Sequence, residues 1–569
     1  MPLTNDSSQR RESFRFLLAS SPSNTNPNNT SWVVTAVGGT AFVAASTAAV
    51  WMAYTQTTKT SRLVSNLSSL SPWFRSSSGS SSSSCSSKSL SSSAATNSTT
   101  AASAAKPQQQ QTKSYYLDYN GTTPVYPEVF DAMAPYLKEH FGNPSSSHLF
   151  GTEPRRGIET ARKQILTQLL GVSVAADDNK SNGNDDTLDL SAVWFTGCGT
   201  ESDNLAIRLA LLSSPSTSTS GSGSGNSHHG RPKHIVTCNV EHPAIENYLV
   251  YLEQQNNTNN YDVVSSSGGI RVTRVPVDEE GRVSARDVLA AITPDTVLVT
   301  LMLANNESGA LQPVREVAEE CRRRGVLCHT DAAQAAGKVS IHLSEMGNPD
   351  MVTIVGHKIG APKGIAALYV RPGCLNEKEH GRVFNNANNN NNTGVLLIGG
   401  GQEFGRRGGT ENTPYIVGLG KAAEMAQTNL ERNASHTEGL RNRLLGNLRR
   451  LLGTAKVRVN GPNDPKQRLP NTLSVGLDGV RSGELLASVG HVVAASAGAA
   501  CHSSCGSSSI SSVLLAMNVP ESFARGTLRL SVGPGTTSRD IDEASELIAR
   551  AARSQWEEQT DGDGAATTQ

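Results

Sequence analysis

Short apolar runs alternate with amphipathic stretches along the chain from Tyr115 onward. The apolar runs have the length of buried strands, and the stretches between them carry apolar positions at helical spacing. Alternating strands and helices predict an α/β fold with a mostly parallel sheet and a site at the carboxyl edge of its strands. The predicted strands are 192–196, 234–238, 296–303, 325–329, 351–355 and 365–370, and the predicted helices are 201–212, 244–253 and 314–324.

The first 113 residues lack such a pattern. Residues 76–93 contain 14 serines in 18 positions, and an Ala/Ser/Thr/Gln-rich tract follows. This composition cannot bury enough apolar surface to offset the entropy lost on ordering, so a disordered leader is predicted. The exception is residues 32–54, whose 23 uncharged positions could cross a bilayer as a helix. Arg10, Arg11 and Arg15 precede them, as in organelle-targeting segments, so both a membrane anchor and a cleaved leader stay open.

Charge and cysteine content narrow the class of protein. The 569 residues include 50 Lys+Arg and 50 Asp+Glu, and a net charge of zero argues against a general nucleic-acid binder. Residues 1–113 hold nine basic and two acidic residues, which leaves 41 and 48 for the remaining chain. The eight cysteines form no regular framework, which fits a reducing compartment. No metal site is predicted, because His228 and His229 have no Cys or acidic residue beside them.

Three segments that follow apolar runs carry candidate chemistry. Residues 196–201 (TGCGTE) could present backbone N–H groups to a phosphate, although a plain strand-to-helix turn has the same pattern. Asp331 could hold a cationic ring nitrogen and Gln334 a ring oxygen, but Asp331 could equally cap a helix. Lys358 follows a buried strand, where loss of solvation suits an amine to form a Schiff base; the alternative is a snorkelling surface lysine. Together, the three segments are the parts of a pyridoxal 5'-phosphate (PLP) site.

These motifs resemble those of a known family. The chain from Tyr116 to about Ala552 is similar to the cysteine desulfurases and selenocysteine lyases, which are class-V, fold-type I PLP enzymes. The resemblance implies a large PLP domain with a mostly parallel mixed sheet and a smaller α+β C-terminal domain. It rests on DYNGTTP (118–124), FGNPSSSH (141–148), GTESDN (199–204), VEHPAI (240–245), ANNESG (304–309), HTDAAQ (329–334), VGHKIGAPKG (355–364), GGGQE (399–403), RRGGTEN (406–412), RLPNT (468–472), GAACHS (498–503) and LRLSVG (528–533).

The resemblance implies three catalytic residues. Lys358 would hold PLP as a Schiff base, and His242 would stack on its ring and relay protons. Cys501 would take up sulfur as a persulfide. From the sequence alone, a free thiol is more commonly buried and inert, but the small, polar residues around Cys501 favour a mobile loop. Cys505 is either a second relay thiol or incidental.

The resemblance also implies the residues that bind cofactor and substrate. Asp331 would pair with the pyridinium nitrogen and Gln334 with the ring hydroxyl. Thr410 would reach the phosphate of the other subunit, so a homodimer is implied. Arg529 would clamp the substrate carboxylate, which a bidentate guanidinium suits. The complete implied set is Gly199, Thr200, His242, Asn306, Asp331, Gln334, His357, Lys358 and Thr410 for PLP, with Arg529 and Asn306 for the substrate.

The implied reaction converts L-cysteine or L-selenocysteine to L-alanine. Sulfur would remain as a Cys501 persulfide for an acceptor protein, as in iron–sulfur cluster assembly, or selenide would be released. Val355 resembles the selenocysteine lyases and Pro243 the desulfurases, so the preference between sulfur and selenium stays open. The alternatives are another class-V enzyme such as an aminotransferase, which the Cys501 loop opposes, and a non-catalytic sulfur-relay scaffold, which the presence of Lys358 and Asp331 opposes.

The chain is therefore expected to have four segments. Residues 1–113 form the leader, 114–430 the PLP-binding large domain, 431–555 the small domain with the Cys501 loop, and 556–569 a disordered tail. Residues 114–131 are expected to be able to pack on the small domain. The basic leader predicts an organelle, with the mitochondrion preferred, or attachment to a membrane.

Overall fold

The computed structural model describes residues 113–173, 188–213, 232–255, 269–375, 396–497 and 510–566, all within the unit 105–569. The predicted leader up to residue 112, with its segment 32–54, lies outside the described residues, as do Cys501 and Cys505. Among the described helices, none combines the length and the apolar character that a bilayer crossing requires.

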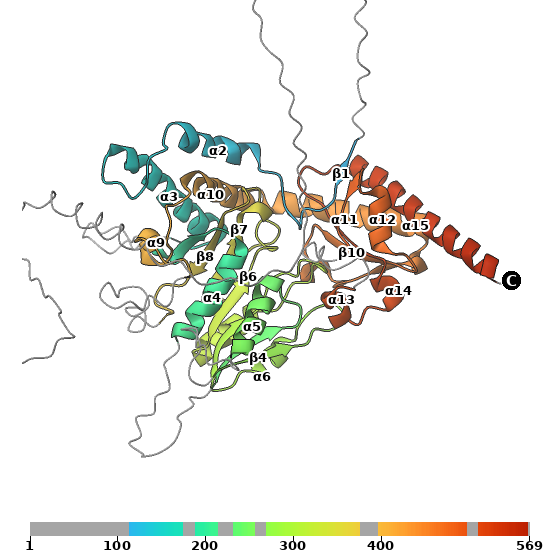
Figure 1. Ribbon diagram of the computed structural model, residues 1–569, viewed down its shortest axis with the longest axis horizontal. Coiled ribbons are helices and arrows are strands. Elements are labelled where there is room, and N and C mark those ends of the chain that lie inside the picture. Colours follow the sequence, from blue (N-terminus) through green and yellow to red (C-terminus); the bar gives the residue numbers. More distant parts are fainter. Residues whose placement is uncertain are drawn as a thin grey trace, which may run out of the picture. The chain divides into compact units, whose positions relative to one another are not determined.

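A seven-stranded sheet forms the centre of the large domain (Figure 1). Its strands are β2 (Val193–Thr196), β3 (Lys233–Cys238), β4 (Ile270–Val275), β5 (Thr296–Thr300), β6 (Leu327–Asp331), β7 (Met351–Val355) and β8 (Ala366–Val370). The order is β2-β8-β7-β6-β5-β3-β4, and β8 alone runs antiparallel to both of its neighbours. The predicted mostly parallel mixed sheet is confirmed. Strand β4 was not predicted, because Arg271 and Arg274 interrupt its apolar run.

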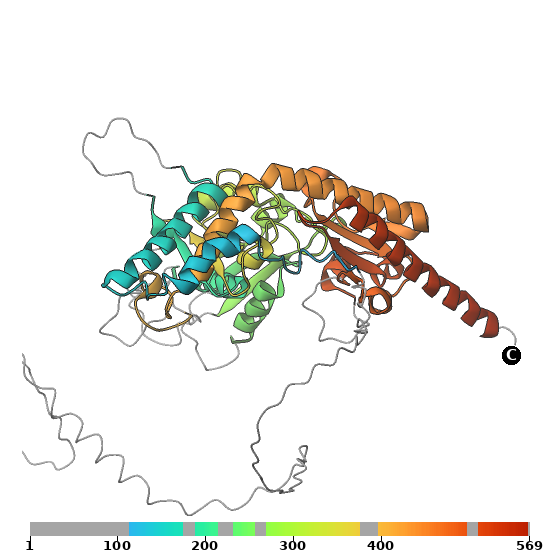
Figure 2. The ribbon, with the colours of Figure 1, turned by 90° about the horizontal axis from the view of Figure 1, so that it is seen from above.

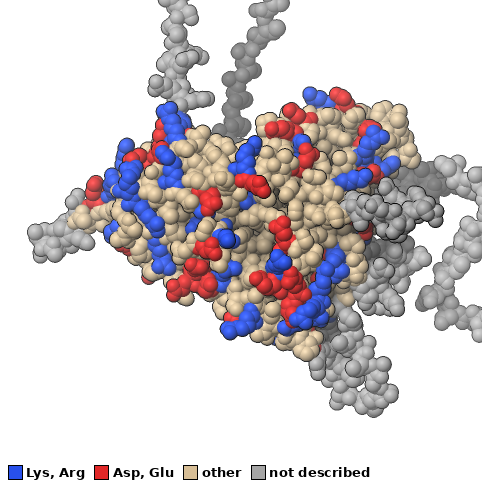
Figure 3. Space-filling view, turned by 180° about the vertical axis from the view of Figure 1, so that it is seen from behind, with Lys and Arg blue, Asp and Glu red and all other residues tan. Residues whose placement is uncertain are grey.

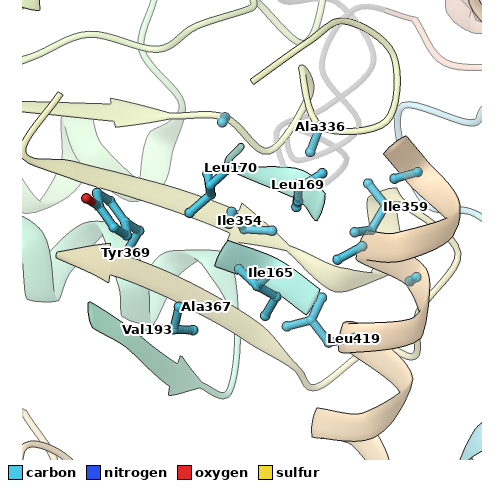
Figure 4. Packing of buried hydrophobic residues seen from close by; sticks show 14 of the residues in the cluster. Ile165, Leu169, Leu170, Val193, Ala336, Ile354, Ile359, Ala367, Tyr369 and Leu419 are labelled. Carbon is cyan, nitrogen blue, oxygen red and sulfur yellow. The ribbon is translucent and has the colours of Figure 1, made fainter. Parts of the chain in front are cut away.

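Helices cover both faces of this sheet (Figures 1 and 2). They are α2 (Pro127–Lys138), α3 (Thr152–Gln164), α4 (Gly199–Ser213), α5 (Pro243–Gln255), α6 (Ala285–Ala290), α7 (Val314–Arg324), α9 (Gln402–Gly405) and α10 (Thr413–Thr428), with a π-helical turn at Ile165–Leu169. Side chains alternate between the faces along each strand. Val193 packs with α3 and α10, whereas Trp194 packs with α4 and α5. Figure 4 shows the first of these cores, where Ile165 and Leu419 lie against the sheet.

The C-terminal part has its own sheet and core. Its strands β9 (Val457–Val459), β10 (Thr472–Leu477) and β12 (Thr527–Ser531) form an antiparallel sheet in the order β12-β10-β9. Its helices are α11 (Leu430–Leu452), α12 (Ser482–Val489), α13 (Ser512–Ala516), α14 (Glu521–Ala524) and α15 (Ser538–Ala566). Short 3-10 turns lie at Leu149–Gly151, Leu190–Ala192, Gly356–Lys358 (η4), Thr454–Lys456 and Pro465–Gln467.

The segment 114–131 contributes to both cores. Strand β1 (Tyr115–Tyr116) pairs in parallel with β11 (Val493–Ala494), and the fully buried Leu117 belongs to the C-terminal core. Val129 belongs instead to the core of the large domain. The chain between Leu117 and Val129 therefore passes from one core to the other, and it carries the DYNGTTP motif.

The expected disordered tail from residue 556 is wrong for residues 556–566, because α15 continues to Ala566. The indole N–H of Trp556 donates to the carbonyl of Asp478 at 2.9 Å, and the Lys456 amino group lies 5.6 Å from the centre of its ring. Gln559 donates to the carbonyl of Gly479 at 3.0 Å. These tertiary contacts hold a helix that its polar sequence does not predict.

Charged side chains of both signs are interspersed on the face seen in Figure 3. Some charged side chains pair between helices: Arg443 on α11 donates to both carboxylate oxygens of Asp542 on α15, with both distances 2.7 Å. Both side chains are more than 40% exposed, so this pair contributes little to stability.

Candidate active site

Three predicted site segments meet at one edge of the large sheet. Asp331 ends β6 and pairs across to Thr353 in the neighbouring parallel strand β7. Lys358 ends η4, which follows β7 directly. Helix α4 begins at Gly199 after β2, close to the end of β7. The sheet therefore brings together side chains that lie far apart in the sequence, as its topology predicts.

The turn before α4 depends on a glycine. A Cβ atom on Gly199 would lie 2.6 Å from Cγ2 of Val355, so a larger residue would separate the start of α4 from β7. The first N–H groups of a helix have no intrahelical acceptor and carry the positive end of its dipole. Thr200 in this first turn is exposed. This geometry suits an anion, although Glu201 already accepts from the N–H of Gly197 at 2.7 Å.

Asp331 is buried at the end of β6, with 7% of the residue exposed. One carboxylate oxygen accepts from the N–H of Ala333 at 2.8 Å. Burial raises its pKa, and the nearby positive charges of His242 and Lys358 partly offset this rise. The residues that follow form turns rather than a helix, so Asp331 does not act as a helix cap.

The amino group of Lys358 points back to the DYNGTTP motif. It donates to the carbonyl oxygens of Asn120 and, at 2.8 Å, Gly121. The motif is fixed on η4 by the N–H of Thr123, which donates to the carbonyl of His357 at 2.8 Å. Lys358 is thus held at the sheet edge by backbone acceptors, which is inconsistent with a snorkelling surface lysine.

His357 and His242 flank this position from two different elements. Burial and the charges of Lys358 and Lys363 lower the pKa of His357 to about 4, so its ring is neutral at neutral pH. His242 precedes α5, and its Nδ1 accepts from the N–H of Ala244 at 3.1 Å. This bond orients the His242 ring.

Arg529 on β12 approaches from the C-terminal domain with a side chain only 2% exposed. Nη2 donates to Asp118 at 2.8 Å and to Ser496 at 3.1 Å, and Nη1 donates to the carbonyl of Asn306 at 3.2 Å. Its buried Nε has no acceptor among the described residues. Leaving a buried donor unpaired is costly, so an anionic group at this position would be stabilised.

The remaining predicted residues lie in different surroundings. Gln334 is buried, and its Nε2 donates to the carbonyl of Asn120 at 3.0 Å. Asn306 is placed beside Arg529 through its own carbonyl. Thr410 is exposed in the segment between α9 and α10. Cys501 lies outside the described residues.

Four residues at the site were not singled out from the sequence. Asn120 and Lys338 form hydrogen bonds with Gln334. Asn120 lies inside the DYNGTTP motif and Lys338 follows the HTDAAQ motif, and neither motif marked these residues. Glu241 and Asp203 are buried carboxyl groups near Asp331. Burial raises the pKa of Glu241 to about 8 and that of Asp203 well above its usual range. The sequence did contain a signal for these two carboxyl groups. Glu241 lies in VEHPAI directly beside His242, and Asp203 lies in GTESDN near Thr200.

His329, two residues before Asp331, gives a pH-dependent prediction. It is fully buried between Thr300 and Thr353, and burial lowers its pKa to about 3. The unfolded chain takes up this proton below about pH 6.5, whereas the folded protein does so only near pH 3. Its contribution to stability is therefore complete above pH 6.5 and falls by up to about 1.4 kcal/mol per pH unit between these values.

When the pH is lowered from 7 to 5, the unfolding free energy of the wild type should fall by about 2 kcal/mol more than that of His329→Gln. Denaturant unfolding at both pH values measures this difference. His491→Asn, at an exposed position, is the control and should follow the wild type. An equal loss in His329→Gln and wild type would contradict the prediction.

Comparison with known proteins identifies the family. The profile of the family aminotransferase class-V matches residues 115–544. A cysteine desulfurase of Trichormus azollae is 39% identical over 434 residues, which cover 76% of this chain and 91% of that protein. The cysteine desulfurase IscS of Clostridium botulinum strain Hall is 35% identical over 447 residues, covering 78% and 96%.

Solved structures agree with these relatives. A NifS-like protein has a TM-score of 0.60 at 30% identity and covers 77% of this chain and 98% of its own. SspA in complex with cysteine has a TM-score of 0.54 at 29% identity, covering 74% and 100%. The chain therefore belongs to the class-V aminotransferases, a family of fold-type I PLP enzymes. Within that family it groups with the cysteine desulfurases.

The described residues fit PLP, the cofactor of this family. Gly199 permits a close approach to the start of α4, where a phosphate can accept from free N–H groups. Asp331 has a carboxylate oxygen beyond the one bonded to Ala333, and that oxygen can pair with a ring nitrogen. The amine of Lys358 lies at the same sheet edge.

Proposed function

We propose that this protein is a PLP-dependent cysteine desulfurase that converts L-cysteine to L-alanine and takes the sulfur onto Cys501. The observation that carries the proposal is the anchoring of both flanks of the Cys501 segment. On one side, Ser496 bonds to Arg529 and Asp118, and on the other Ser511 donates to Glu307 at 2.6 Å. Glu307 adjoins Asn306, so both flanks attach beside the buried arginine. An aminotransferase has no need of a thiol at this place.

Each site residue has a separate role in the proposed reaction. Lys358 would hold the cofactor covalently, and its amine would move the α-proton of the substrate. Asp331 keeps the ring nitrogen protonated, and PLP, when bound, supplies an electron sink for the α-carbon. Arg529 would donate to the substrate carboxylate from its Nε–H, which has no acceptor among the described residues, and would thereby orient the substrate. Thr200, His357 and the α4 N-terminus hold the phosphate.

We place selenocysteine as the alternative substrate. Val355 is 5% exposed and packs against Gly199, so it contributes shape to the phosphate turn but no hydroxyl group. Pro243 begins α5 directly after His242. These two residues match different branches of the family, so the preference between sulfur and selenium stays open and is decided by the assay below.

Alanine release from L-cysteine and from L-selenocysteine tests the proposal. The wild type should form alanine from L-cysteine, and Cys501→Ala should lose at least about 10²-fold of this rate because no thiol accepts the sulfur. Cys505→Ala is the matched control and should retain activity. If Cys501→Ala still releases selenide from selenocysteine, the selenium lyase is favoured. If neither substrate yields alanine, the proposal fails.

We further propose a homodimer, a sulfur acceptor and an organelle location. Exposed apolar side chains gather on α2 and the following segment, at Phe130, Leu137, Phe141, Leu149 and Phe150. A second copy of the chain would cover them and meet Thr410. The acceptor would take the Cys501 sulfur for iron–sulfur cluster assembly. The basic leader would direct the protein to an organelle, with the mitochondrion preferred, and residues 32–54 would be either removed with it or anchored in a membrane.

A further inference from the structure

Lys338 lies in the turns that follow Asp331, and its amino group sits between two amide oxygens. It donates to Oε1 of Gln334 at 2.7 Å and to Oδ1 of Asn120 at 3.0 Å. Its stem lines a cavity of about 50 Å³ that Lys358 also lines. Among the described residues, no carboxylate lines this cavity, so the two amides take the place of an ion-pair partner.

Lys338 sets the orientation of the side-chain amides of Gln334 and Asn120. Burial and the charges of Lys358 and Arg529 lower the pKa of Lys338 well below its usual value. Whether charged or neutral, the amine keeps at least two N–H groups, enough for two oxygen acceptors. With Lys338 as the donor to both, each amide turns its oxygen toward Lys338 and its nitrogen away.

For Gln334, this orientation fixes the nitrogen on the side of the catalytic lysine. Its Nε2 donates to the carbonyl of Asn120, the same oxygen that accepts from Lys358. An amide nitrogen carries two N–H groups, so one remains for another acceptor. With the opposite orientation, Gln334 would present an oxygen to the carbonyl of Asn120, and two acceptors would repel each other.

For Asn120, the same orientation lets its side-chain amide form hydrogen bonds with residues of the C-terminal domain. Its side chain is fully buried, and Nδ2 donates to Thr472 on β10 at 2.9 Å. Its Oδ1 also accepts from Asn471 at 3.1 Å. The Lys338 amine thus acts at the centre of a network that reaches from the end of β6 to the C-terminal domain.

We propose that Lys338 is a positioning residue that fixes the amide of Gln334 so that its nitrogen donates to the ring oxygen of the cofactor. This inference rests on the proposed function, in which Gln334 pairs with that oxygen. A donor there stabilises the ionised ring oxygen, and an acceptor would destabilise it. Lys338 therefore tunes cofactor binding and ionisation through Gln334.

The test is a titration of apoprotein with PLP, followed by absorption of the bound cofactor as a function of pH. Lys338→Met removes the donor at similar length, so the dissociation constant should rise about tenfold or more and the pH midpoint of the visible band should shift. Lys338→Arg retains donors and should restore the midpoint in part. Lys421→Met, which removes a half-exposed lysine paired with Glu424 on α10, should match the wild type.

A double-mutant cycle separates positioning from a general loss of packing. In a Gln334→Leu background, Lys338→Met should produce no further shift of the pH midpoint, because no amide remains to be oriented. Circular dichroism of each apoprotein checks folding, and Lys338→Leu, which also has no donor, replaces the Met variant if that one does not fold. A wild type that binds no PLP would refute the proposed function. A wild type that binds PLP, with Lys338→Met equal in affinity and midpoint, would overturn only the role of Lys338.

Discussion

Lys358→Ala should abolish alanine formation from L-cysteine, with a rate loss of roughly 10⁴-fold or more, and should remove the visible absorption of the purified protein. The loss is large because one side chain has two tasks. In the proposed mechanism it would bind the cofactor covalently and would move the α-proton of the substrate. The structure supports both tasks, since backbone carbonyls hold the amine at the sheet edge within the electrostatic reach of Asp331.

Absorption spectra and alanine assays on proteins purified in parallel measure this effect. Lys466→Ala, an exposed lysine in a 3-10 turn of the C-terminal domain, is the control and should keep both the band and the activity. Lys338 is the other amine that lines the cavity next to Lys358. If the band persists in Lys358→Ala but disappears in Lys338→Ala, the assignment of the covalent lysine is wrong.

The second large effect concerns stability, for which we expect Glu403→Ala to lower the unfolding free energy by about 3–5 kcal/mol. Glu403 on α9 is paired with Arg162 on α3 at 2.8 Å, and their side chains are 2% and 6% exposed. Its second oxygen accepts from the N–H of Phe195 on β2 at 3.0 Å. Removing the carboxylate leaves a buried guanidinium and a buried N–H without their partner.

The pKa of Glu403 indicates why removing one partner should lower the unfolding free energy more than replacing both partners by apolar residues. Burial raises that pKa even though Arg162 attracts the ionised form. Desolvation thus outweighs the attraction, and the pair adds little net stability of its own. The double variant Arg162→Met/Glu403→Leu should therefore recover most of the loss.

Thermal and denaturant unfolding compare these variants, and light scattering reports whether the particle mass changes with them. Asp542→Ala, which breaks the exposed pair with Arg443, is the matched control and should cost no more than about 1 kcal/mol. A single Glu403→Ala variant as stable as this control would show that the buried pair does not hold α9 against α3 and β2.

Much of the large domain was predictable, because its strands carry their own signal. A strand buried on both faces must be a short apolar run, as in β7 and β8, where every residue is buried. Asp331 and Lys358 then stood out as polar residues at the ends of such runs. The antiparallel direction of β8 was not readable, because strand direction depends on pairing partners rather than on composition.

The sequence by itself determined the family, the sheet-forming runs and the candidate residues at strand ends, since these depend on local periodicity and on motifs of adjacent residues. Tertiary structure decided how the residues cooperate. Arg529 meets Asp118 across 411 positions, Lys338 meets Asn120 across 218, and Trp556 meets Asp478 across 78. Hydrogen bonds between such distant residues arise only when the packed cores bring their backbones together, so no local pattern could reveal the unpaired Nε of Arg529 or the oriented amide of Gln334.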